Sequence, residues 1–187
     1  GMTFVDVEPE TYAIDPEAAT RAFTRATKAI MPVHLFTQMA DLPRICAAAR
    51  EHDVLVLEDS AEAIGMRLGS QHAGTFGLGG VLSFFPTKTL AAIGDAGAVM
   101  TDDDALAERA RLLASCGVTG DGDHLEIGYE TRCDPLQAAV LLCRLDRLDA
   151  DVARRAEIAE RYDARLRELA PHVNVPTLRA TDPPSTY

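Results

Sequence analysis

Short apolar runs alternate with helix-like segments through the first half of the chain, and this alternation is the feature that most restricts the fold. The apolar runs predict strands at residues 3–7, 29–35, 54–58, 81–85 and 97–101. Helices are predicted to begin at Asp15, which a proline and an acid follow, and over residues 41–51. The run at residues 54–58 is apolar almost throughout, which is typical of a strand covered on both faces. We therefore expect βαβ units and an α/β fold with a mostly parallel sheet.

The second half of the chain has a mostly helical pattern. Residues 102–116 predict an amphipathic helix capped by Asp102, and residues 118–129 form a loop rich in glycine and aspartate. Residues 134–169 are helical in pattern almost throughout, which is too long for one ordinary globular helix. We therefore expect a break near Asp149 and a helix that leaves the sheet domain.

The acidic composition argues against several classes of protein. The 187 residues include 18 basic and 29 acidic side chains, a net charge of −11, whereas a nucleic-acid binder needs a basic face. The longest apolar run, residues 138–143, is far shorter than the ~20 residues of a membrane helix, and the first residues lack the basic start of a secretory signal. The spacing of the cysteines predicts neither a disulfide scaffold nor a metal site, and favours a reduced, cytoplasmic protein. The four cysteines are Cys46, Cys116, Cys133 and Cys143.

Two groups of polar residues follow predicted strands, where ligands bind in parallel α/β sheets. Asp59 lies directly after one strand, and Ser83 and Lys88 follow another. An acid and a lysine at neighbouring strand ends are the two groups that a pyridoxal phosphate site requires, because lysine forms a Schiff base and a carboxylate keeps the pyridine nitrogen protonated. Only Lys28 and Lys88 are lysines, and Lys28 precedes a strand. Taken alone, the aspartate also fits a turn or helix cap, and the lysine a solvated charge.

Five segments in order carry a resemblance to a known family. The sequence VLSFFPTKTLAAIGDAGAVMTDD at residues 81–103 resembles the cofactor-lysine segment of the DegT/DnrJ/StrS nucleotide-sugar aminotransferases. Four other segments resemble motifs of the same family at natural spacing, which makes the resemblance specific. They are FVDVEPETYAIDPE at residues 4–17, PVHLFTQMADL at 32–42, VLEDSAEAIG at 56–65 and GYETRCDPLQAAVLLCRLDRLD at 128–149.

The resemblance implies a role for each matching residue. Lys88 would form the Schiff base with pyridoxal 5′-phosphate and move the proton, Asp59 would pair with the pyridinium nitrogen, and Ser83 would contact the phosphate. Glu62 stands where the family usually has a glutamine that bonds the ring 3-oxygen. Retention of lysine at residue 88 favours transamination, because a dehydratase branch of the family has histidine there. No metal is implied.

The resemblance also implies the fold, the substrates and the partners. The fold would be the large domain of fold-type I pyridoxal phosphate enzymes over residues 1–148, with a linking helix and the start of an incomplete small domain over residues 149–187. Family members are about twice as long, so we expect a partial chain that is inactive alone. The substrates would be a nucleotide-linked keto sugar and an amino-acid donor, glutamate, in a homodimer without nucleic acid or membrane partners.

Some positions depart from the family pattern and leave alternatives open. Glu130 replaces an asparagine that reaches the cofactor phosphate of the neighbouring subunit, and a carboxylate there would be repelled by about 1–4 kcal/mol. Thr37, Leu78 and Ala96 are tolerable packing changes. A catalytically degenerate or truncated relative that serves as a structural or regulatory partner is therefore the alternative function. A different nucleotide-binding α/β domain is disfavoured, because the dense glycines precede a strand instead of following one.

Two further features have structural explanations. His34 follows a strand, and we expect it to be a structural residue or one that supports a residue of the site from behind. The mixed charges of residues 144–167 predict a solvated helix face with i,i+4 pairs such as Glu157–Arg161.

Overall fold

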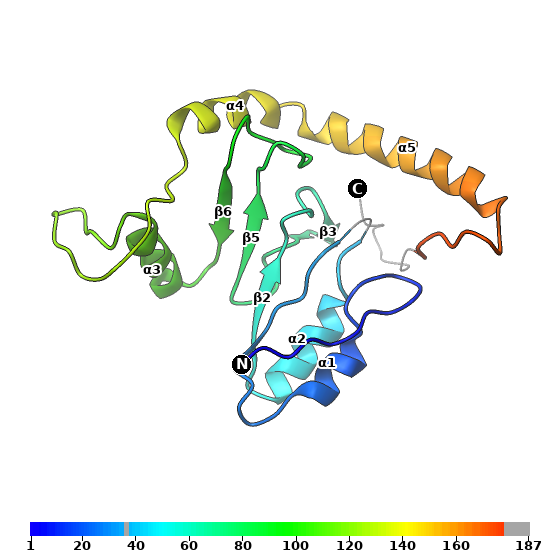
Figure 1. Cartoon of the computed structure of the whole chain (residues 1–187), viewed down its shortest axis with the longest axis horizontal. Coiled ribbons are helices and arrows are strands. Elements are labelled where there is room, and N and C mark those ends of the chain that lie inside the picture. The colour runs from blue at the N-terminus through cyan, green and yellow to red at the C-terminus, as the bar shows by residue number, and fades with distance from the viewer. Residues whose placement is uncertain (36–37, 178–187) are drawn as a thin grey trace.

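The computed structural model describes residues 1–35 and 38–177, which form an α/β fold around a four-stranded sheet (Figure 1). The strand order is β1-β2-β5-β6. β2 runs parallel to β1 and β5, and β6 runs antiparallel to β5. The prediction of a mostly parallel sheet is confirmed. The strands are β1 (Ala29–Ile30), β2 (Leu55–Asp59), β5 (Gly79–Ser83) and β6 (Gly97–Met100), with a separate hairpin of β3 (Arg67–Leu68) and β4 (Gln71–His72).

Two short helices cover one face of the sheet. α1 (Pro16–Ala22) begins at Asp15, whose carboxylate accepts the N–H groups of Glu17 and Ala18, and α2 (Leu42–Glu51) begins at Asp41, whose carboxylate accepts the Arg44 N–H. Both starts were predicted, the first from an acceptor side chain followed by proline and the second from an apolar helix face.

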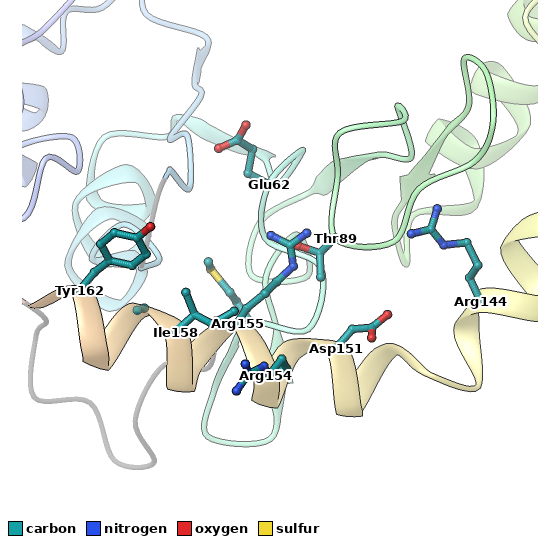
Figure 2. Close-up of a pocket in the computed structure, with 10 residues that line it drawn as sticks. Glu62, Thr89, Arg144, Asp151, Arg154, Arg155, Ile158 and Tyr162 are labelled. Carbon is teal, nitrogen blue, oxygen red and sulfur yellow. The ribbon is translucent and has the colours of Figure 1, made fainter.

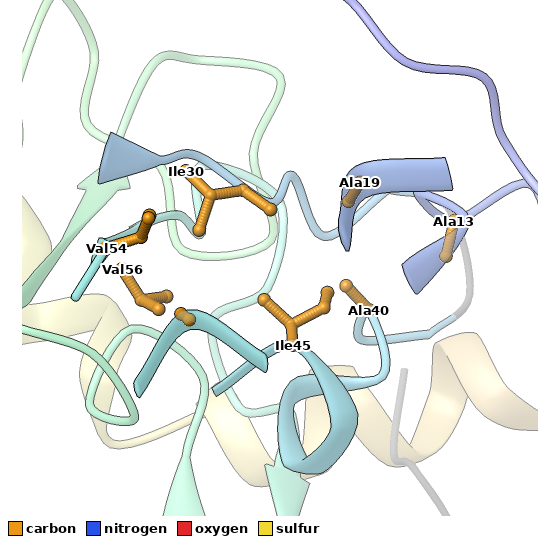
Figure 3. Close-up of a cluster of buried hydrophobic side chains, with 8 residues drawn as sticks. Ala13, Ala19, Ile30, Ala40, Ile45, Val54 and Val56 are labelled. Atoms are coloured by element: carbon orange, nitrogen blue, oxygen red, sulfur yellow. The ribbon is translucent and has the colours of Figure 1, made fainter. Parts of the chain in front are cut away.

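The main core lies between these helices and the strands (Figure 3). Ile45 and Ala49 of α2 face Val56 of β2 and Ile30 of β1, and the small side chains of Ala13, Ala19 and Ala40 let the helices approach closely. The mutual burial of these apolar groups fixes α2 against the sheet. The core therefore holds β2 in place. The acidic residues Glu58, Asp59 and Glu62, called the acidic cluster below, lie at or just after the carboxyl end of this strand.

The other face of the sheet is bare within the described residues. Leu55 of β2 is 50% exposed, and Val81 and Val99 of the neighbouring strands are also exposed on this face. The prediction that residues 54–58 form a strand covered on both faces is therefore wrong. The apolar run meets a helix layer only on the side of Val56, because strand side chains alternate between the two faces.

The prediction of a strand at residues 3–7 is wrong, and the strand predicted at residues 29–35 is shorter in the structure. Residues 3–7 form no strand; Val7 makes a single isolated bridge with Ile14. Only Ala29–Ile30 of the second run forms a ladder, and Val33 adds one bridge to Asp59. An apolar run needs a partner strand to complete its hydrogen bonds, and sequence pattern alone does not supply one.

α4 (Pro135–Leu145) and α5 (Leu148–Arg167) run past one end of the sheet, and α3 (Asp104–Ala114) lies near the other end, after β6 (Figure 1). α3 is capped by Asp103, so the prediction of Asp102 as its cap is wrong by one residue. α4 and α5 confirm the predicted break, which falls at residues 146–147. Within the described residues, no helix is both long and apolar enough to cross a bilayer.

Candidate functional site

The site is built at the carboxyl end of β2 and β5, which are parallel neighbours. Asp59 is the last residue of β2 and lies opposite Val81 in the ladder. Its Oδ1 accepts the backbone N–H of Ala61 at 3.1 Å. Among the described residues, Oδ2 has no hydrogen-bond partner, so one carboxylate oxygen remains available to a cationic N–H group.

Ser83 ends β5 two residues beyond the partner of Asp59, on the same face of the sheet. Its Oγ accepts the N–H of Phe85 at 3.3 Å, which leaves the hydroxyl proton free to be donated. The chain then turns, with the Lys88 N–H bonded to the Phe85 carbonyl, and this turn returns Lys88 toward the end of β2. The turn therefore places an amine next to the acidic cluster.

Lys88 and Glu62 form an ion pair across the site. Lys88 Nζ donates to Glu62 Oε1 at 2.9 Å, and the side chains are 19% and 43% exposed respectively. The two residues are 26 positions apart in the sequence and come from the ends of two different strands. The structure thus brings the predicted lysine and acidic residues together at one sheet edge, as the strand-end argument requires.

A groove of about 680 Å³ opens beside this ion pair (Figure 2). Glu62 and Thr89 line one wall, and α5 lines the other. Arg155 reaches from α5 toward Thr89, the residue after Lys88 (Figure 2). Arg144, Arg154 and Asp151 also line the groove, so charges of both signs surround it.

Sequence reasoning missed this groove. The prediction of a solvated helix face with i,i+4 pairs is confirmed for Arg167 and Asp163, which lie 3.5 Å apart, whereas Glu157 pairs with Arg154 at 2.7 Å rather than with Arg161. Arg144 donates to the carbonyl of Ala91 at 2.9 Å, which ties the end of α4 to the loop after Lys88. No periodicity signal identifies a helix face that packs beside a loop distant in sequence.

Glu130 is neutralised by its neighbour Arg132. The guanidinium bonds both carboxylate oxygens, at 2.9 Å and 3.1 Å. The Arg132 hydrogen bonds hold the pKa of Glu130 below its ordinary value, and the Cys116 thiol adds a weaker contact at 3.5 Å. Glu130 therefore does not present an uncompensated charge. Thr37, the other notable departure, lies outside the described residues.

A buried carboxylate stands directly behind Asp59. Glu58 and His34 have fully buried side chains, and their Oε2 and Nε2 atoms lie 3.0 Å apart. The backbone N–H groups of Gly74, Phe76 and Gly77 also donate to Glu58, at 2.6, 2.6 and 2.9 Å. His34 lies in this buried network, where it can support its neighbours. The network on Glu58 was not predicted, because its donors come from a turn far along the chain.

This network makes folding stability depend on pH. Burial raises the pKa of Glu58, but the His34 hydrogen bond and the three backbone donors outweigh it and hold the pKa below its ordinary value. The folded state therefore binds this proton less readily than the unfolded chain does. The stability from ionised Glu58 is fully present above the unfolded pKa, about 4.3, and is lost as the pH falls through the lower folded value.

Glu58→Gln is expected to lower the free energy of unfolding by about 3 kcal/mol at neutral pH, because it breaks a buried hydrogen-bonded charge. The difference from the unmodified protein should shrink as the pH is lowered from about 4 towards 2. Urea unfolding of the intact protein at several pH values measures this difference in the free energy of unfolding. Glu157→Gln, which removes an exposed carboxylate on α5, is the control and should behave like the unmodified protein. A difference that stays constant with pH would contradict the assignment.

Known proteins resemble the chain over nearly its whole length. The sequence model of the DegT/DnrJ/EryC1/StrS aminotransferase family matches residues 2–186. The "Pleiotropic regulatory protein" of Geobacillus stearothermophilus is 42% identical over 88% of this chain and 44% of its own length. The UDP-2-acetamido-2-deoxy-3-oxo-D-glucuronate aminotransferase of Pseudomonas aeruginosa is 37% identical over 89% of this chain and 46% of its own length.

Solved structures give the same result for the fold. A DegT DnrJ EryC1 StrS aminotransferase from Brucella abortus superposes with a TM-score of 0.86 and 38% identity, covering 96% of this chain and 49% of that one. The chain therefore spans about half the length of the relatives it matches. The order of the motifs, the sheet and the extent of these matches lead to one conclusion: the chain belongs to the DegT/DnrJ/EryC1/StrS aminotransferase family.

Proposed function

We propose that the protein to which this chain belongs transfers an amino group from an amino acid, glutamate, to a nucleotide-linked keto sugar, with pyridoxal phosphate held by Lys88. The observation that carries the proposal is the meeting of Lys88, Glu62 and Asp59 at one sheet edge, with Lys88 Nζ 2.9 Å from Glu62. Aminotransferases of this family depend on pyridoxal phosphate.

The residues present fit this cofactor. Lys88 supplies a primary amine that is only 19% exposed, Asp59 has a free carboxylate oxygen among the described residues, and Ser83 has a hydroxyl proton to donate. These three groups match an aldehyde, a pyridine nitrogen and a phosphate respectively. The donor set is thus complete for the part of the cofactor that this chain would hold.

When bound, pyridoxal phosphate supplies an aldehyde that takes up the amino group and a ring that withdraws the electron pair from the reacting carbon. Asp59 would hold the proton on the ring nitrogen through its free oxygen. Lys88 would carry the proton from the substrate carbon to the carbon that accepts it. Glu62 would orient Lys88 Nζ through the 2.9 Å contact. An ionised carboxylate donates no hydrogen bond, so Glu62 would face the ring 3-oxygen only with a proton between the two oxygens.

Arg155 is the group of the groove beside Lys88 that suits an anionic substrate. The carboxylates of Glu62 and Asp151 also line the groove, Arg154 pairs with Glu157 at 2.7 Å, and Arg144 donates to the Ala91 carbonyl. The guanidinium group of Arg155 can bind phosphate oxygens in a bidentate manner. A nucleotide-linked sugar carries a diphosphate, which such a groove would hold close to the amine. The aminotransferase from Pseudomonas aeruginosa, by its name, acts on a sugar of this kind.

The same proposal includes the domain division, the oligomeric state and the cellular location. We place the division between a large and a small domain at residues 148 and 149, next to the break before α5. We propose a homodimer, as the family resemblance implies. We also propose a cytoplasmic location, since the four cysteines are all free, as in a reducing compartment.

A regulatory or structural role is the second candidate, favoured by the name of the Geobacillus stearothermophilus relative. The argument from Glu130 weakens, because Arg132 compensates its charge at 2.9 Å and 3.1 Å. The complete set of Lys88, Asp59 and Ser83 supports the enzyme instead.

The test uses the intact protein with ¹⁵N-labelled glutamate and keto sugars linked to uridine or thymidine diphosphate. Mass spectrometry is expected to find ¹⁵N in an amino sugar nucleotide, and glutamate alone should convert the bound cofactor to pyridoxamine phosphate. A protein that binds no cofactor and transfers no nitrogen would refute the proposal and favour the regulatory role. Conversion with another donor would overturn the choice of glutamate alone.

A further inference from the structure

Glu58 is a buried carboxylate with every oxygen fully engaged. Its residue is 1% exposed. Oε2 accepts from His34 Nε2 at 3.0 Å and from the Gly74 N–H at 2.6 Å, and Oε1 accepts from the N–H groups of Phe76 and Gly77 at 2.6 Å and 2.9 Å. Four donors on one buried carboxylate are far more than a packing position needs, because an apolar side chain would fill the same space without desolvating a charge.

His34 is held in one orientation by its second nitrogen. The Ala40 N–H donates to Nδ1 at 3.1 Å, so Nδ1 carries a lone pair and the ring proton lies on Nε2. The imidazole is therefore neutral and donates to Glu58. The charge of Glu58 is compensated by oriented N–H groups rather than by a cation.

The same segments clamp the backbone of Asp59. The His34 N–H donates to the Asp59 carbonyl at 3.0 Å, and the Asp59 N–H donates to the Pro32 carbonyl at 2.9 Å. The Ser60 N–H donates to the Val81 carbonyl at 3.0 Å on the opposite side. Adjacent strand residues point to opposite faces of the sheet. Glu58 therefore fixes the strand on the buried face, while the Asp59 side chain lies on the opposite face, at the candidate site.

The turn that donates to Glu58 also approaches β2 closely. A Cβ at Gly77 would lie 2.2 Å from the Val56 carbonyl oxygen, and Gly74 has a φ of +88°, which L residues with a side chain rarely adopt. Only glycine lets the backbone reach the carboxylate at these positions. The turn, the histidine loop and the strand therefore converge on one carboxylate behind Asp59.

We propose that Glu58 and His34 are positioning residues that fix the Asp59 carboxylate for the cofactor ring nitrogen by locking the end of β2 to the 74–77 turn. The proposal rests on the proposed function. It assigns these two residues no contact with the cofactor or the substrate. Glu58 and His34 act through Asp59, whereas the other core residues of the sheet contribute only to the stability of the fold.

The test compares Glu58→Gln with Val56→Ala in the intact protein. Both residues are buried on β2, but the side chain of Val56 has no hydrogen-bonding group and lies in the apolar core, so Val56→Ala leaves the backbone contact of Val56 with the turn in place. Absorbance titration gives the dissociation constant for pyridoxal phosphate, and hydrogen exchange of the cofactor-free protein follows the amides of Phe76 and Gly77. Glu58→Gln is expected to weaken cofactor binding about 10- to 100-fold and to speed exchange at both amides, since a charged hydrogen-bond partner is lost.

Val56→Ala should lower the melting temperature but leave cofactor affinity and the exchange of the two amides unchanged. His34→Gln retains an N–H donor toward Glu58 and should preserve more affinity than His34→Phe. Should Glu58→Gln and Val56→Ala weaken binding equally at equal melting temperature, the role is merely structural and the proposal is overturned. If the unmodified protein binds no pyridoxal phosphate, the proposed function fails first, and the positioning role fails with it.

Discussion

Lys88→Ala is expected to abolish covalent attachment of pyridoxal phosphate and to reduce amino transfer by about 1000-fold or more, because the nucleophile and the proton carrier are lost together. Borohydride reduction followed by peptide mass spectrometry should find the cofactor on Lys88 in the unmodified protein and nowhere in the variant. The half-buried amine beside Glu62 is the structural basis for this expectation.

The chain supplies a matched control, since it has only two lysines. Lys28→Ala removes the exposed lysine before β1 and should leave trapping and rate unchanged. Lys88→Arg keeps a cation that can pair with Glu62 but cannot be trapped, so it should lose activity without losing stability. Trapping that persists in Lys88→Ala would show that the cofactor lysine is assigned wrongly.

Asp59→Asn is expected to lower the rate of amino transfer by about 10- to 1000-fold, the range over which a nearby opposite charge shifts the protonation of a cationic group. The amide can still accept the Ala61 N–H through its oxygen, so the end of β2 should keep its structure. The free carboxylate oxygen, which would hold the ring proton, is what the substitution removes. Steady-state kinetics and the absorbance of the bound cofactor at several pH values measure the two effects.

Asp121→Asn is the matched control, because Asp121 is exposed in the loop after α3. It should leave rate, cofactor absorbance and melting temperature unchanged. If Asp59→Asn behaved like Asp121→Asn, the carboxylate after β2 would not face the ring nitrogen, and another acid would have to be sought at the same edge.

Several parts of the fold could be predicted from local pattern alone. Asp15, Asp41 and Asp134 were each predicted at a helix start, and each caps its helix through its own carboxylate. The cap of α3 was misplaced by one residue because Asp102, Asp103 and Asp104 are equivalent in sequence. Only the backbone geometry decides which of three adjacent aspartates turns toward the first N–H groups.

Strand pairing could not be predicted in the same way. Residues 3–7 have the pattern of a strand but remain outside the sheet, and β6 pairs antiparallel with β5. A segment forms a strand only when a neighbouring strand pairs with it. The sequence pattern of a segment therefore indicates a preference for strand but not whether a partner is present.

The sequence by itself determined which residues can do the chemistry. With two lysines in the chain and Asp59 directly after a strand, Lys88 and Asp59 were the candidates before any coordinates, because the reactivity of an amine and a carboxylate belongs to the residue type. The tertiary structure decided what surrounds them. It brought Glu62 to Lys88, Arg132 to Glu130, and His34 with the 74–77 turn to Glu58. The first and last of these contacts join residues from different strands and turns, so they arise only once the sheet has assembled and the core has set the register of β2 against β5.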